Sequence, residues 1–154
     1  MNIFLKSKIL ISACLLGKRV RYDGIVKYYD FSSLDNYELI ACCPEVDGGL
    51  PIPRFPSEIQ VNGKVLNVNG LDVTDEFNYG ANIALKLVLN ENIKVAILKS
   101  KSPSCSNKMV YDGTFSGVLM RGVGVTMKVL EENGIKVFDE NEIEEALAYL
   151  SVLK

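Results

Sequence analysis

The chain has 154 residues, of which 48% are hydrophobic and 23% charged, with a formal net charge of −2. A chain of this length fits one domain with a buried core, and its composition excludes extended disorder. The nearly balanced charge gives no general attraction to nucleic acid, and the absence of histidine excludes His-based acid–base and metal chemistry.

The sequence also bears on location. No stretch approaches the ~20 apolar residues of a membrane span. The first residues, Met1–Lys6, lack the apolar core and the cleavage site of a signal peptide. We therefore expect a cytosolic protein. Because thiols stay reduced in that compartment, the four cysteines are not expected to form two structural disulfides.

In the first third of the chain, two apolar runs predict buried strands that end at cysteines. The run 8–13 leads to Cys14, and the run 37–41 leads to Cys42 and Cys43. Between them we expect a glycine-containing loop at 15–24, either a small hairpin around Asp23-Gly24 or a ligand-facing loop, and then a short helix over 27–34. Four of the five prolines lie in 44–56, which predicts a stiff irregular loop that is neither helix nor strand. Such a loop is a candidate functional element.

The remaining elements alternate between strands and helices. A hairpin is expected over 59–68 around Asn62-Gly63, and a helix capped by Asp72 or Thr74 is expected to reach Asn90. Its apolar face contains Phe77, Ile83, Ala84, Leu87 and Val88. A strand over 94–98 leads toward Cys105, and the glycine-rich segment 106–124 is predicted to be irregular with a short hairpin. A helix over 125–132 closed by Asn133-Gly134, a strand over 135–138 and a helix from a cap at Asn141 to Leu150 follow. This alternation predicts a doubly wound, mostly parallel sheet.

Cysteines at strand ends suggest a functional site. The carboxyl ends of parallel strands meet at the edge where open α/β sheets bind ligands, so Cys14, Cys43 and Cys105 are expected to converge there. Cys42 lies within an apolar strand and is expected to pack as a small core residue. Three thiolates without histidine suit a soft metal centre, either an iron–sulfur cluster or zinc. Three ligands leave one metal position open for chemistry.

Basic residues accompany these cysteines along the chain. They form either a solvated rim or an anion-attracting mouth of the site, and they are Lys18, Arg19, Arg21, Arg54, Lys99 and Lys101.

Four motifs in one order carry a resemblance over nearly the whole chain: Ser12-Ala13-Cys14-Leu15-Leu16-Gly17, Cys43-Pro44-Glu45 with Gly48–Arg54, Lys101-Ser102-Pro103-Ser104-Cys105, and Asp112–Gly117 through Gly122–Thr126. They resemble a family of small domains, formerly of unknown function, that includes the iron–sulfur-dependent 2-thiouracil desulfidases. The resemblance implies a single Rossmann-like domain over 1–154 with an oxygen-sensitive 4Fe–4S cluster. It also implies a non-redox hydrolysis that converts C=S of a 2-thiouracil-like pyrimidine to C=O and releases sulfide.

Residue roles follow from the same resemblance. The cluster ligands are expected to be Cys14, Cys43 and Cys105, with the fourth iron open. Glu45 and Ser102 are the implied catalytic residues, and a loop carboxylate such as Glu45 is a natural base in a chain without histidine. Ser102 could instead cap a turn. We assign Ser104 and Arg54 to substrate binding, with a loop-pinning salt bridge as the alternative for Arg54.

Two positions depart from the family pattern, and two other functions remain open. Cys42 stands where similar sequences have an aliphatic residue, and Ser106 stands where they have glycine, so we expect the Ser106 side chain to narrow the pocket.

The first alternative function is sulfur insertion into a nucleobase of RNA by the same open iron, which would favour a broad basic surface. The second is a non-enzymatic zinc or iron–sulfur module. The leading interpretation has a small thiolated base as its partner, with no membrane or nucleic acid.

Overall fold

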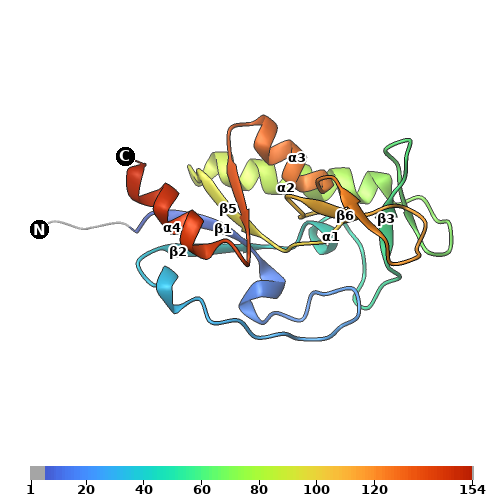
Figure 1. Ribbon diagram of the computed structural model, residues 1–154, viewed down its shortest axis with the longest axis horizontal. Coiled ribbons are helices and arrows are strands. Elements are labelled where there is room, and N and C mark those ends of the chain that lie inside the picture. The colour runs from blue at the N-terminus through green and yellow to red at the C-terminus, as the bar shows by residue number, and fades with distance from the viewer. Residues whose placement is uncertain (1–5, 154) are drawn as a thin grey trace, which may run out of the picture.

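The computed structural model describes residues 6–153, which form one mixed α/β domain (Figure 1). Residues 1–5, most of the segment tested for a signal peptide, lie outside the described part, as does residue 154. The central sheet has four parallel strands in the order β2-β1-β5-β8. The strands are β1 (Lys8–Ser12), β2 (Glu38–Cys42), β5 (Val95–Leu98) and β8 (Lys136–Asp139). The predicted parallel, Rossmann-like sheet is confirmed.

Helices cover both faces of this sheet. The helices α2 (Thr74–Asn90) and α3 (Val125–Glu132) pack on one face, where Leu10 and Leu98 point. The helix α4 (Ile143–Val152) and the 3₁₀ turns η1 (Ala13–Leu16) and η2 (Ser32–Leu34) cover the face that receives Ile11 and Ile97. Because both faces are buried, the strands read as continuous apolar runs in the sequence. In the part of the chain that the structure describes, no helix has the length and apolar character needed to cross a membrane.

Two hairpins lie beyond the carboxyl edge of the sheet (Figure 1). One joins β3 (Ser57–Ile59) to β4 (Val65–Asn67), and the other joins β6 (Met109–Tyr111) to β7 (Leu119–Arg121). The buried Glu58 carboxylate connects them, because its Oε1 accepts the N–H groups of Gly113 and Phe115 at 3.0 and 3.1 Å. Both hairpins were predicted, although the first turn is longer than two residues, since Gln60 N–H bonds the Lys64 carbonyl.

Four local predictions were wrong. Neither Asp72 nor Thr74 is the cap of α2: the helix begins at Thr74 after Val73, with no side-chain cap. The segment 27–34 forms only the turn η2, because Tyr28 is 85% exposed and only the end of the segment, with Phe31 and Leu34, packs against the core. The proline-rich loop begins with one helical turn, α1 (Pro44–Asp47), because proline is preorganised for the first position of a helix. Asn141 does not cap α4; its N–H donates to the Asp139 carboxylate at 2.8 Å, and the helix begins at Ile143.

Candidate functional site

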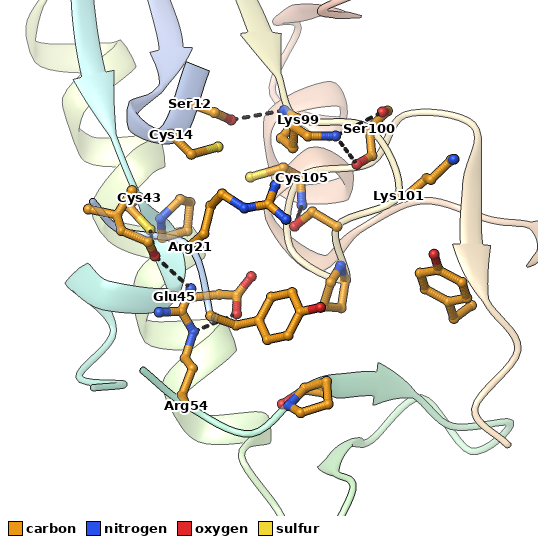
Figure 2. Close-up of a pocket in the computed structure, with 18 of the residues that line it drawn as sticks. Ser12, Cys14, Arg21, Cys43, Glu45, Arg54, Lys99, Ser100, Lys101 and Cys105 are labelled. Atoms are coloured by element: carbon orange, nitrogen blue, oxygen red, sulfur yellow. Dashed lines mark hydrogen bonds and ion pairs between the residues drawn. The ribbon is translucent and has the colours of Figure 1, made fainter. Parts of the chain in front are cut away.

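A pocket of about 600 Å³ lies at the carboxyl edge of the sheet (Figure 2). As predicted from the strand order, the three strand-end cysteines all line it. Cys14 lies in η1 directly after β1, Cys43 lies between β2 and α1, and Cys105 lies in the turn after β5. Cys42, the last residue of β2, also lines the pocket; it is 4% exposed, close to the 5% of Cys105, and both residues belong to the core beneath α2 and α3.

A close approach of two helices positions Cys43 and Glu45. A Cβ atom on Gly80 of α2 would lie 1.8 Å from the Pro44 carbonyl oxygen, and a Cβ atom on Gly48 would lie 2.0 Å from the Glu76 carbonyl oxygen. Only glycine at both positions lets α1 rest directly on α2. Since Cys43 precedes α1 and Glu45 lies within it, this contact sets where both side chains enter the pocket.

Ser102 and the start of α3 hold the turn that carries Cys105. The Ser102 hydroxyl accepts the backbone N–H groups of Ser104 and Cys105 at 3.1 and 3.0 Å. Thr126 N–H donates to the Ser104 carbonyl at 2.9 Å, and a Cβ atom on Gly124 would lie 2.3 Å from that carbonyl. Ser102 lines the pocket, and its hydroxyl also caps the turn that carries Cys105.

Two serines predicted to face the pocket do not line it. Ser104 is 1% exposed, and its hydroxyl lies 2.8 Å from that of Thr126, so we assign Ser104 to the support of the Cys105 turn and not to substrate. Ser106 is also 1% exposed, and its hydroxyl accepts the Met109 N–H at 3.2 Å. The expectation that Ser106 narrows the pocket is wrong, because its hydroxyl is used to begin β6.

The electrostatics of the site keep the free thiols protonated. Burial raises the pKa of Cys14 to about 11 and that of Cys105 to about 12, and it also raises the pKa of Cys43. The pKa of Cys14 is raised further by Cys43 and lowered by the charges of Lys99 and Arg21, while a hydrogen bond from Ser12 lowers the pKa of Cys105. A group that binds these cysteines as thiolates must therefore bring positive charge, as a metal centre does.

The donor set fits an iron–sulfur cluster. Within residues 6–153, no three or more His, Cys, Asp or Glu side chains converge as ligands of a single metal ion would. A 4Fe–4S cluster does not require that convergence, because each thiolate binds a different iron. Three thiols that come from three strand ends and line one pocket can each bind a different iron of such a cluster.

The basic residues named from the sequence differ in whether they line the pocket and in what they contact. Arg54 uses all three nitrogens: Nε donates to Glu45 Oε1 at 3.1 Å, and Nη1 and Nη2 donate to the carbonyls of Pro51 and Val20. Its side chain lines the pocket but is only 6% exposed. Arg54 therefore mainly holds the loop in place through its salt bridge and hydrogen bonds, the alternative named above for this residue. The pocket is also lined by Arg21, Lys27, Lys99 and Lys101, whereas Lys18 and Arg19 do not line it.

Sequence reasoning missed two supporting side chains at the pocket edge. Ser12 accepts the Lys99 N–H at 2.9 Å and so ties β1 to the segment that leaves β5. Glu140 pairs with Lys99 Nζ at 2.8 Å and accepts the Ser100 N–H and hydroxyl. The position of Ser12 at a strand end, two residues before Cys14, was a usable signal; nothing in the sequence marked Glu140.

Comparison with known proteins identifies the family. The family model described as 2-thiouracil desulfurase matches residues 9–142. The chain belongs to this family. A relative from Bacillus subtilis, the uncharacterized protein YbbK, is 37% identical over 150 residues, covering 90% of this chain and 99% of YbbK. A solved structure, the [4Fe-4S]-dependent thiouracil desulfidase TudS, is 47% identical with a TM-score of 0.92, covering 96% of this chain and all of that one.

Proposed function

We propose that this protein is a 4Fe–4S-dependent desulfidase that hydrolyses the C=S group of a thiouracil-like pyrimidine to C=O and releases sulfide. The observation that carries the proposal is the meeting of Cys14, Cys43 and Cys105 in one pocket with the Glu45 carboxylate at its wall. Membership of the 2-thiouracil desulfurase family and the likeness to TudS support it.

We assign the cluster to Cys14, Cys43 and Cys105, and we leave Cys42 in the core. When bound, a cluster with three cysteine ligands supplies one iron without a protein ligand, a Lewis acid toward the substrate sulfur. A reducing, cytosolic location fits four free thiols and an oxygen-sensitive centre.

Glu45 is the proposed general base. Its Oε1 is held by Arg54 Nε at 3.1 Å, and among residues 6–153 no donor is bound to Oε2, which can take a proton from water. The water oxygen forms the new bond to carbon, the carbon–sulfur bond breaks, and the two protons of water leave with the sulfide. No electrons are gained or lost by the substrate, so the reaction needs no reductant.

Ser102 serves the turn and the substrate together. Its oxygen accepts two backbone N–H groups, while its own hydroxyl proton remains available to a water or substrate in the pocket. Ser102 therefore combines the two roles that the sequence left as alternatives, since capping Cys105 uses only its acceptor capacity.

Anaerobic reconstitution followed by a sulfide-release assay tests the proposal. The holoprotein is expected to bind about four iron and four labile sulfide per chain and to convert 2-thiouracil to uracil with one sulfide released per base. A protein that takes up zinc but no iron, or a holoprotein that leaves every thiolated base and nucleoside of a panel intact, would refute it.

A further inference from the structure

Five cations line the pocket, and three of them, Arg54, Lys99 and Arg21, differ in how many of their donors are used by contacts within the protein. Arg54 has a partner on each nitrogen, as described above. The Lys99 ammonium is bound by the Glu140 carboxylate at 2.8 Å and by the Ser100 carbonyl and hydroxyl at 3.2 and 3.3 Å. Neither has much capacity left for a ligand.

Arg21 is different. Its Nε and Nη2 donate to Asp23 Oδ1 and Oδ2 at 3.3 and 3.2 Å, and Asp23 Oδ1 in turn accepts the Ile25 N–H at 3.0 Å. A guanidinium has five N–H donors, so Asp23 uses two of them, and within residues 6–153 the other three have no partner. The side chain is 18% exposed, and Asp23 fixes its orientation through a planar two-point contact.

The unused donors are directed toward the proposed reaction site. Figure 2 shows the Arg21 side chain pointing into the pocket, in the space framed by the labelled Cys14, Cys105 and Glu45. Arg21 also lies close enough to Cys14 for the two groups to interact electrostatically. A planar fork of N–H groups, held by an acid and aimed into a pocket, suits a ligand with hydrogen-bond acceptors on a flat edge.

Building on the desulfidase function proposed above, we propose that Arg21 is a further catalytic residue, which donates N–H groups to the ring acceptor beside the carbon that loses sulfur, and that Asp23 is its positioning residue. When water adds to that carbon and its proton passes to Glu45, negative charge moves onto the atoms bonded to the carbon. Donors that already point there stabilise this charge without reorganisation. Arg21 stays protonated throughout, so it acts by charge and hydrogen bonds alone.

Anaerobic steady-state kinetics with 2-thiouracil test this role. Arg21→Gln keeps most of the side-chain length but loses the charge and the fork, and kcat is expected to fall about 10²–10³-fold, as for loss of a transition-state donor. The iron content and visible spectrum should stay unchanged. Arg21→Lys should restore part of the loss, and KM should change less than kcat, because the donor acts mainly in the transition state.

Asp23→Asn separates positioning from contact. It should lower kcat less than Arg21→Gln does, and the double variant should be no slower than Arg21→Gln alone, because Asp23 acts only through Arg21. The matched control is Arg19→Gln, from the same loop; Arg19 Nη1 bonds the Gly24 carbonyl at 2.7 Å, but its side chain does not line the pocket. Its kcat should stay close to that of the wild type.

The outcomes separate this inference from the proposed function. An active wild type together with an equally active Arg21→Gln protein overturns the role of Arg21 and leaves the desulfidase function standing. A loss of cluster in both Arg21→Gln and Arg21→Lys also overturns it, since the residue would then be structural. A wild-type holoprotein that is inert toward 2-thiouracil and toward every other thiolated base and nucleoside of the panel overturns the function and this inference with it.

Discussion

The contact between Gly80 and Pro44 offers a test of how the fold positions the site. In Gly80→Ala, the new Cβ would lie 1.8 Å from the Pro44 carbonyl oxygen and 2.6 Å from its carbon. Both are backbone atoms, so α1 must move off α2 by more than about 1 Å to restore van der Waals contact. Cys43 and Glu45 move with it.

The stability change follows from two opposing effects. Replacing glycine by alanine inside a helix stabilises by about 0.5–1 kcal/mol, whereas overpacking costs about 1–3 kcal/mol. We expect a net loss of about 1–2 kcal/mol, which lowers Tm by about 2–8 °C for a chain of this size. Displacing catalytic groups by about 1 Å can cost about 10²-fold in rate, so sulfide release should fall by that order even though the protein still folds.

Thermal unfolding followed by circular dichroism and the anaerobic sulfide-release assay check this prediction. The control is Asn78→Ala, an exposed site two residues earlier on α2, which gains helix propensity without a new contact. Its Tm should equal or exceed that of the wild type, with full activity. A Gly80→Ala protein as stable and as active as Asn78→Ala would show that the close approach of α1 to α2 does not position the site.

Three further predictions concern the ligands, the base and pH. Iron and labile sulfide measured after reconstitution should be retained in Cys42→Ala and lost in each serine variant of Cys14, Cys43 and Cys105; loss in Cys42→Ala alone would reverse the ligand assignment. Glu45→Gln should keep the cluster spectrum while sulfide release falls about 10²–10⁴-fold, and undiminished turnover would place the base elsewhere. Burial opposes ionisation of Glu140, but hydrogen bonds from Lys99 and Ser100 outweigh it and lower its pKa below the ordinary 4.5. Urea unfolding should therefore show a wild-type advantage over Glu140→Gln that is full above pH 4.5 and shrinks as the pH falls further; an advantage independent of pH would contradict this.

The sheet and the convergence of the cysteines were predictable because both follow from short-range patterns. Apolar runs that end at Cys14 and Cys43 give strand positions, and parallel pairing then brings their carboxyl ends to one edge. The residue types alone had left two candidates for the metal centre, zinc and an iron–sulfur cluster. The family motifs favoured the iron–sulfur cluster.

The orientation of side chains around the site was not predictable, because it depends on contacts between distant segments. Ser102 and Ser104 are two residues apart in one motif, yet the start of α3 takes the Ser104 hydroxyl while Ser102 lines the pocket. In the sequence, Gly80 is only a residue of low helix propensity inside a predicted helix. Its role becomes visible once the structure places the Pro44 backbone against it. The short helix α1 was missed because its first residue is proline, which signals a loop as often as a helix start.

Hydrolysis in ¹⁸O-labelled water tests the central claim most directly. The anaerobically reconstituted protein is incubated with 2-thiouracil and no reductant, and the uracil is analysed by mass spectrometry alongside sulfide. The proposed reaction predicts one labelled oxygen in each uracil and one sulfide released with it, and the protein without its cluster should form neither. Unlabelled uracil, or turnover that requires an added reductant, would contradict the hydrolytic desulfidase function.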